Sequence, residues 1–210
     1  GQELATLPML QQVTNIGFIH QNPDDQLIAE DVWHELAFGL ENIGVSNDEM
    51  KLRIGEMASF FGITAWFHQK VHDLSGGQRQ LLNIAATLLL RPTVLILDEP
   101  TAQLDPIAAK ELIELLGRIH RDLGVTIIVV EHKLDDVLPH TTHFLCIDNG
   151  EVVLYQERAS FFQQLPLKWR PFLPTVVQAT LAIDSENTPA WTIAQAKQTV
   201  QPYLTEEIVK

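Results

Sequence analysis

The chain has 210 residues, of which 46% are hydrophobic, enough for a domain with a sizeable core. Its formal net charge is −13 and no run of basic residues offsets it, so a nucleic-acid partner is not expected. No run of about eighteen apolar residues occurs, which argues against a membrane-spanning helix, and the single Cys146 fits a reducing compartment.

In chain order, the first predicted elements are a strand and a short helix on either side of a polar loop. Residues 13–21 alternate loosely in polarity and predict a strand that ends in the loop Gln21–Gln26. Residues 31–40 mix apolar side chains with acids and predict a short helix. That helix opens a helical region that we expect at about residues 31–90.

Two longer helices are predicted next. Ser46–Phe61 has the pattern of a helix with Ser46 as its N-cap and Glu49 as the partner in a capping box. Gln78–Leu90 is strongly apolar and predicts a largely buried helix that stops before Pro92.

Buried strands flank a helix in the middle of the chain. Val94–Leu97 and Val125–Val130 are continuous apolar runs, which are typical of parallel strands buried on both faces. Between them, Asp105 is placed to cap a helix that begins with proline, runs to about Leu123 and ends at Gly124. The side chains of this helix that we expect to face the core are Ile107, Leu112, Ile113, Leu115, Leu116 and Ile119.

The last part of the chain predicts a hairpin and a small tail. Phe144–Ile147 and Val152–Tyr155 flank Asp148-Asn149-Gly150, a strong turn signal. The alternation of apolar strands with helices predicts an α/β fold with a parallel sheet. We expect a main domain over residues 1–165 and, after a proline-broken connector, a C-terminal extension over residues 166–210.

The most informative segment is Leu74–Gln78, which reads Leu-Ser-Gly-Gly-Gln. Gly76 and Gly77 leave backbone amides uncovered, and the start of the following helix adds positive potential, so a phosphate can approach. The Ser75 hydroxyl can donate to a phosphate oxygen. A plain N-cap is the alternative, but a serine cap needs no glycine pair, so that interpretation explains only part of the segment.

Two adjacent carboxylates, Asp98 and Glu99, follow the strand Val94–Leu97. Such neighbours repel each other unless a cation or different surroundings separate their roles. In nucleotide hydrolysis the first carboxylate usually reaches Mg²⁺ and the second polarises the attacking water. A solvated acidic loop is the alternative, which Pro100-Thr101 directly after an apolar strand disfavours.

Three further residues are candidates whose signals are weak when each is taken alone. The amide of Gln21 can touch both Mg²⁺ and water, and His132 at a strand end could contact a γ-phosphate through an imidazole N–H. Loop glutamines are mostly solvated, lone histidines are mostly structural, and Asp105 is explained adequately as an N-cap. His140 and His143 lack a second ligand pair, so no metal site is predicted there.

In this order and spacing, the motifs closely resemble the ATPase subunit of ABC transporters. Gln21 matches the Q-loop, Leu74–Gln78 the LSGGQ signature and Val94–Glu99 the Walker B strand. Thr101–Asp105 matches the D-loop, and His132 matches the switch histidine. The resemblance implies a P-loop NTPase-like parallel sheet with a helical signature subdomain, and ATP and Mg²⁺ as cofactors.

The resemblance also implies a role for each matching residue. Glu99 would be the catalytic base, with His132 and Gln21 as further catalytic residues, and Asp98 and Gln21 would hold Mg²⁺. Ser75, Gly76, Gly77 and Gln78 would contact ATP held by a second ATPase subunit in a head-to-tail dimer. Asp105 of the D-loop is counted among the nucleotide-binding residues.

A narrower resemblance points to the energy-coupling-factor ATPases, which power uptake of vitamins and of cobalt or nickel. Ile16–Gln26 and Asp31–Gly39 carry it, and Leu173–Val177 is similar to their C-terminal extension, which helps two ATPases dimerise. This implies a peripheral subunit at the cytoplasmic face of the membrane, where residues from Gln21 to Trp33 would meet transmembrane transporter components.

The phosphate-holding Walker A loop, G-x-x-x-x-G-K-[ST], is the motif that departs from the family, since the chain has no Gly-Lys dipeptide. We expect that loop upstream of Gly1, and we expect the isolated chain to be inactive. Another kind of ABC transporter ATPase, or a hydrolysis-incompetent dimerisation partner, is the alternative. An ABC protein acting on ribosomes or DNA is disfavoured by the acidic charge.

Overall fold

The computed structural model describes residues 3–183 and 189–207 and contains two compact units, Gly1–His132 and Lys133–Lys210. Two parts of the predicted C-terminal extension, residues 184–188 and 208–210, lie outside the described residues. Over the stretches that the structure describes, no helix combines the length and the apolar character needed to cross a membrane.

A parallel sheet forms the base of the first unit. Its strands are β1 (Ile16–Ile19), β2 (Val94–Asp98) and β3 (Thr126–Val130), in the order β1-β2-β3. The predicted parallel sheet is therefore confirmed, with its central strand and its third strand where the apolar runs place them. The first strand is shorter than predicted, because helix α1 (Met9–Asn15) takes up residues 13–15 and continues to the residue before β1.

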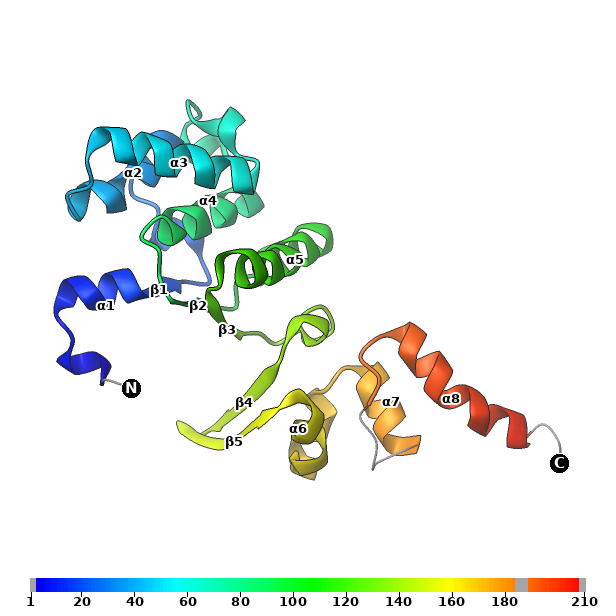
Figure 1. Cartoon of the computed structure of the whole chain (residues 1–210). Coiled ribbons are helices and arrows are strands. Elements are labelled where there is room, and N and C mark those ends of the chain that lie inside the picture. The colour runs from blue at the N-terminus through cyan, green and yellow to red at the C-terminus, as the bar shows by residue number, and fades with distance from the viewer. Residues whose placement is uncertain (1–2, 184–188, 208–210) are drawn as a thin grey trace. The chain divides into compact units, whose positions relative to one another are not determined.

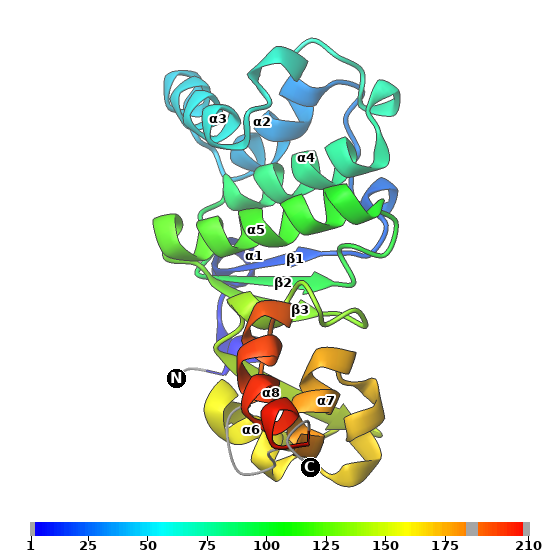
Figure 2. The ribbon, with the colours of Figure 1, turned by 90° about the vertical axis from the view of Figure 1, so that its right-hand side faces the viewer.

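The sheet is covered on one face by two helices, α4 (Gly76–Leu88) and α5 (Pro106–Leu123), as Figures 1 and 2 show. Helix α4 comes close to β1 at Gly17, where an added Cβ would lie 2.5 Å from Thr87 Cγ2. The helix-facing residues Ile19, Leu95 and Leu97 are fully buried.

The opposite face of the sheet is open among the described residues. Phe18, Ile128 and Val130 are 41%, 45% and 51% exposed, and Ile96 between them is half-buried. These positions alternate with the helix-facing ones, as the period of two in a strand requires. The expectation of strands buried on both faces is therefore wrong for this part of the chain.

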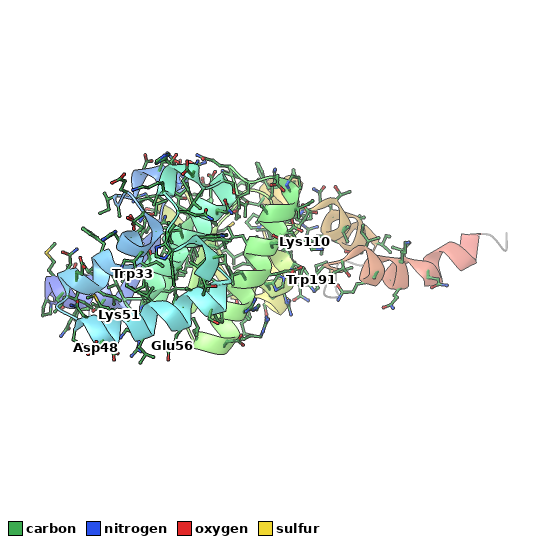
Figure 3. The ribbon with its side chains drawn as sticks, turned by 90° about the horizontal axis from the view of Figure 1, so that it is seen from above. Trp33, Asp48, Lys51, Glu56, Lys110 and Trp191 are labelled. Carbon is green, nitrogen blue, oxygen red and sulfur yellow. The ribbon has the colours of Figure 1, made fainter. Side chains whose placement is uncertain are left out.

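Helices α2 (Val32–Asn42), α3 (Asn47–Phe61) and α4 build the predicted helical region (Figure 1). Figure 3 shows Asp48, Lys51 and Glu56 along the outer side of α3, which is exposed. The three helices share one core, whose most deeply buried members are Val32, Leu36, Leu40, Ile54, Ala58, Ile63, Leu82 and Ala85.

The capping box predicted for α3 is wrong, and a different helix has one. Within the described residues the Ser46 hydroxyl caps no amide, and the Glu49 carboxylate, which the box would direct back to the Ser46 amide, lies instead 2.7 Å from Arg53 Nε. Helix α4 carries the box instead: Ser75 Oγ accepts from the Gln78 amide at 3.3 Å, and Gln78 Oε1 accepts from the Ser75 amide at 2.8 Å. This reciprocal pair starts α4 at the glycines, earlier than predicted.

Helix α5 begins and ends as the sequence predicts. The Asp105 carboxylate accepts from the amides of Ile107 and Ala108 at 2.9 and 3.1 Å, and Gly124 ends the helix with a left-handed φ of 68°. Ile107 is 73% exposed, so its predicted core position is wrong, because it lies in the first turn before the buried stripe begins. That stripe consists of Leu112, Ile113, Leu116 and Ile119.

The second unit contains the predicted hairpin, β4 (His143–Asp148) paired with β5 (Glu151–Glu157). Asn149 and Gly150 both have positive φ, 51° and 81°, as a tight hairpin turn requires. The α-helices that follow are α6 (Arg158–Gln164), α7 (Thr175–Ile183) and α8 (Ile193–Glu207). Short 3-10 segments lie at Leu4–Thr6, Pro23–Asp25, Thr64–Trp66, Val71–Asp73, Leu138–His140 and Leu167–Phe172.

The hairpin and the predicted extension share one core, and the division into two compact units falls between His132 and Lys133. Phe144 of β4 contacts Phe161 and Phe162 of α6, at centroid distances of 4.8 and 5.4 Å. The buried members of this core are Leu138, Phe161, Phe162, Leu165, Leu173, Val177 and Leu181. The boundary between family domain and extension at residue 165 stays a prediction.

Candidate active site

Four of the predicted site residues lie at the carboxyl ends of the parallel strands. Gln21 follows β1, Asp98 ends β2 with Glu99 directly after it, and His132 follows β3. Carboxyl ends of adjacent parallel strands lie at one edge of a sheet, where α/β proteins commonly bind ligands. Segments far apart in the sequence thus supply one polar cluster.

Glu99 is the centre of this cluster. Gln21 Nε2 donates to Glu99 Oε2 at 3.1 Å, and His132 Nε2 lies 2.8 Å from Glu99 Oε1. The Glu99 side chain is 27% exposed and that of His132 is 84% exposed. Both carboxylate oxygens therefore have a partner, while water can still reach the group. This is the geometry of a carboxylate that is oriented but accessible.

The backbone of Glu99 is held in an unusual conformation. Its φ is 44°, in the left-handed region that costs roughly 1–3 kcal/mol for a residue other than glycine. Its amide donates to the Val130 carbonyl at 2.9 Å and its carbonyl accepts from the Ala102 amide at 3.1 Å. These bonds turn the chain out of β2 directly after Asp98 and aim the Glu99 side chain at Gln21 and His132.

Asp98 and Gln21 offer the oxygen donors that suit Mg²⁺. Asp98 is exposed at the end of β2. The Gln21 side chain binds Glu99 through Nε2, so its oxygen, Oε1, remains available to a cation. No group of three or more His, Cys, Asp or Glu side chains is assembled for a metal among the residues described. A short donor set fits Mg²⁺, which keeps several waters and takes further oxygens from phosphates.

The Ser75–Gln78 segment forms a second polar feature, at the start of α4. An added Cβ at Gly76 would meet no atom within 4 Å, so the backbone there is open to an approaching group. Of the described residues, none accepts a hydrogen bond from the Gly76 or Gly77 amide, and none connects this segment directly to Glu99. Two free amides at a helix N-terminus fit an anion.

An ion pair ties the loop after β1 to the start of α4. Asp24 Oδ1 lies 2.7 Å from Arg79 Nε, and Arg79 also donates to the Leu74 carbonyl, the residue before Ser75. The loop that begins with Gln21 is therefore connected to the turn that holds Ser75–Gln78.

A pair of side-chain amides makes the same connection one helical turn further along α4. Asn83, which is 4% exposed, donates from Nδ2 to Gln26 Oε1 at 2.8 Å. Gln26 Oε1 also accepts from the His20 amide at 2.7 Å, and Gln26 Nε2 donates to the Phe18 carbonyl at 2.9 Å. This pair was not predicted, and its signal in the sequence is a polar Asn83 inside an apolar helix.

Glu131 is a further residue that the sequence analysis did not single out. Its Oε1 accepts from both the amide and the hydroxyl of Thr101, at 3.1 and 2.7 Å. Glu131 thus connects the end of β3 with the turn after Glu99. An acidic residue next to His132, facing a threonine after the two acids of β2, was the available signal.

A shallow hollow of about 450 Å³ lies beside the start of α2, where Trp33 is visible in Figure 3. The Trp33 and Phe67 rings meet edge to face there, with centroids 5.5 Å apart. The nearby Glu35 carboxylate is 6% exposed and holds the preceding loop by accepting from the Ile28 and Ala29 amides at 2.9 and 2.7 Å. The hollow is lined by Asp31, Trp33, His34, Phe67, His68 and Lys70.

Comparison with known proteins gives the family of this chain. Residues 1–102 match the family described as ABC transporter. A putative ABC transporter ATP-binding protein of Bacillus anthracis is 43% identical over 97% of this chain and 37% of the relative. An energy-coupling factor transporter ATP-binding protein, EcfA1 of Clostridium novyi, is 34% identical over 82% of this chain and 61% of the relative. The chain thus spans less than two thirds of the length of either relative.

Among solved structures, CbiO1 from Clostridium perfringens, part of the ABC transporter complex CbiONQ, is 34% identical with a TM-score of 0.66. The match covers 70% of this chain and 59% of CbiO1. The expected α/β, P-loop NTPase-like fold is thereby confirmed. Sequence motifs, family match and fold agree, and this chain belongs to the ATPase family of ABC transporters.

Proposed function

We propose that the protein containing this chain hydrolyses ATP as a subunit of an energy-coupling-factor importer. The observation that carries the proposal is Glu99, held on its two oxygens by Gln21 and His132. In that position the Glu99 carboxylate can accept a proton from a water that attacks the γ-phosphate. The exposed His132 imidazole can donate to phosphate oxygens as charge develops on them.

Mg²⁺, when bound, would draw charge from the phosphate oxygens and help orient them. Asp98 and the Gln21 carbonyl oxygen would hold it. Because Gln21 donates to Glu99 from its side-chain nitrogen and would bind the cation through its side-chain oxygen, one side chain would relate the position of the base to that of the metal. The bond to Glu99 and the remaining oxygen support a role for Gln21 in sensing the nucleotide.

The signature segment is proposed to act on the ATP of a second ATPase subunit. Its free Gly76 and Gly77 amides fit phosphate oxygens, and no described contact joins them to this chain's own Glu99. The anion site at Ser75–Gln78 is thus separate from Glu99 of the same chain. This separation is expected if each nucleotide lies between two subunits, with the signature segment of one and the carboxylate of the other. Homo- and heterodimers both satisfy this requirement.

The energy-coupling-factor class is supported by similarity to EcfA1, which is named an energy-coupling factor transporter ATP-binding protein, and the transporter role by similarity to CbiO1, part of an ABC transporter complex. On this proposal the cargo is a vitamin or a transition-metal ion, and the ATPase works at the cytoplasmic face of the membrane. The hollow beside Trp33 and Phe67 offers apolar rings with charged neighbours to a transmembrane partner. The aromatic pair is the kind of surface on which interface anchors dock.

Glu99→Gln tests the proposal in the intact gene product that carries this chain. Glutamine keeps the shape but is a very poor base, so ATP turnover should fall by roughly 10²- to 10⁴-fold while ATP-bound dimers accumulate. Steady-state hydrolysis and gel filtration with MgATP measure both effects. Glu111→Gln, which neutralises an exposed carboxylate on α5, is the matched control.

An undiminished rate of ATP hydrolysis in Glu99→Gln would remove Glu99 from the role of base.

A second candidate function rests on the absence of a Gly-Lys dipeptide from the 210 residues of this chain. On that alternative the protein is a hydrolysis-incompetent partner that completes another subunit's site through Ser75–Gln78. It predicts no hydrolysis by the intact product alone, together with stimulation of an active partner that is lost in Ser75→Ala.

A further inference from the structure

We propose that Glu131 is a positioning residue that fixes Glu99 and His132 relative to each other through Thr101. The inference rests on the proposed ATPase function. It starts from a closed path of contacts: Glu99 is followed by the turn containing Thr101, Thr101 binds Glu131, and Glu131 precedes His132, whose Nε2 lies 2.8 Å from Glu99 Oε1.

The first step concerns the acceptor. One oxygen of the Glu131 carboxylate, Oε1, receives two hydrogen bonds from Thr101, one from the amide at 3.1 Å and one from the hydroxyl at 2.7 Å. Hydrogen bonds to an ionised acceptor are stronger than those between neutral groups. Both bonds span from β3 to the chain that leaves β2, so they hold two separate segments together.

The second step concerns the turn. Two of its backbone bonds are local: the Ala102 amide donates to the Glu99 carbonyl at 3.1 Å, and the Leu104 amide donates to the Thr101 carbonyl at 3.0 Å. Glu99 has a left-handed φ of 44°, a conformation that persists only when its surroundings enforce it. From outside the turn, the Val130 carbonyl holds the Glu99 amide and the Glu131 carboxylate holds Thr101, so Glu131 fixes the part of the turn that the bond to Val130 does not reach.

The third step concerns His132. Its side chain is 84% exposed, so packing does little to orient it. The residue directly before it, Glu131, is the one anchored to the turn after Glu99. Anchoring Glu131 therefore fixes the backbone from which the His132 side chain extends toward the Glu99 carboxylate. Freeing Glu131 should loosen the base and the histidine together.

Two matched pairs of variants test the inference in the intact gene product. Glu131→Ala removes the acceptor, whereas Glu131→Gln keeps an oxygen that can accept from Thr101. Thr101→Val removes the hydroxyl donor at nearly the same volume, whereas Thr101→Ser keeps it. If Glu131→Ala fails to fold, the two threonine variants still test the inference, because each changes only the Thr101 side chain and leaves the Glu131 carboxylate in place.

The expected result is a fall in kcat of roughly ten- to a hundredfold in Glu131→Ala with KM for ATP unchanged, and a smaller fall in Thr101→Val. Glu131→Gln and Thr101→Ser should retain most of kcat. A merely structural role would lower the melting temperature of Glu131→Ala without this division between kcat and KM. Equal losses in Glu131→Ala and Glu131→Gln, or no loss in either, would overturn the inference.

Hydrogen exchange on the 210-residue chain keeps this test separate from the proposed function, because it needs no turnover. Amides of the turn Thr101–Leu104 should exchange faster in Glu131→Ala than in the wild type. Their exchange rates in Glu131→Gln should equal those of the wild type. If the wild type does not hydrolyse ATP, the proposed function fails while the exchange result still decides whether Glu131 holds the turn. Unchanged exchange in Glu131→Ala would contradict the proposal outright.

Discussion

Glu99 gains its position from three segments of the chain. Gln21 and His132 hold its oxygens, while the turn to Ala102 and the bond to the Val130 carbonyl hold its backbone. A base on a flexible side chain would lose orientation, and misplacement by about 1 Å can cost roughly a hundredfold in rate. The arrangement therefore supports the proposed role of Glu99 as a fixed catalytic base.

His132→Ala is the prediction at this scale. Loss of the imidazole leaves Glu99 Oε1 without its donor and removes an N–H that could reach phosphate, so hydrolysis by the intact product should slow by roughly ten- to a thousandfold. Steady-state ATPase rates measure it. His143→Ala, at an exposed histidine on β4, should leave the rate unchanged. An equal rate in both variants would return His132 to a structural role.

Motif residues could be predicted at this scale, but their supporting contacts could not. Phosphate and cation chemistry is predicted by Ser75–Gln78 and Asp98-Glu99, because few other functions need those residue types together. The Asn83–Gln26 and Thr101–Glu131 bonds join residues 57 and 30 positions apart, and each pair depends on a fold that must already exist. A left-handed Glu99 was equally hidden, since glutamate carries no preference for that conformation.

At the scale of elements, the N-cap of α2 shows how a helix start depends on charge. The Asp31 carboxylate accepts from the His34 amide at 3.0 Å, and His34 Nδ1 lies 2.7 Å away. The bond from the His34 amide, followed by the bond from its ring, holds the pKa of Asp31 below its usual range. Asp31 also pairs in a β-bridge with Lys70, which places this helix start beside the hollow near Trp33.

Asp31→Ala should destabilise the chain by about 0.5–2 kcal/mol at neutral pH, whereas Asp31→Asn, which is still a good cap, should cost less. Because the folded pKa of Asp31 is lowered, its charge stabilises the fold above the unfolded pKa of about 3.9 and stops doing so as pH falls through the folded value. Urea unfolding at pH 7 and near pH 3 measures this. A gap between wild type and Asp31→Asn that stays constant with pH would contradict it.

The elements that sequence reasoning placed well are those whose ends carry their own chemistry. Asp105 and Gly124 bound α5, and Asn149-Gly150 fixes the hairpin, because capping and turn preferences are local. One failure occurred where a side chain has a competing partner. Glu49 binds Arg53 instead of the Ser46 amide. Ile107 failed for another reason: it is exposed because it lies in the first turn of α5, before the buried stripe begins.

At the scale of the whole molecule, the candidate site lies within one of the two compact units. Gly1–His132 holds every candidate catalytic and phosphate-binding residue, and Lys133–Lys210 holds the aromatic core around Phe161 and Phe162. The open face of the sheet, with Phe18, Ile128 and Val130, belongs to the first unit. The site edge of that unit thus depends on its own strands and helices for its geometry.

The isolated 210-residue chain is predicted to bind MgATP no more tightly than a Kd of about 1 mM, or roughly −4 kcal/mol. Asp98 and Gln21 offer oxygens to the cation, but these residues include no Gly-Lys loop to hold the β- and γ-phosphates, and a net charge of −13 repels the anion. Titration calorimetry at physiological ionic strength measures the affinity. Asp98→Asn serves as the comparison, because it should change a weak signal little while strongly reducing any tight, Mg²⁺-dependent one. Saturable micromolar binding that Asp98→Asn abolishes would show that the chain already contains a complete nucleotide site.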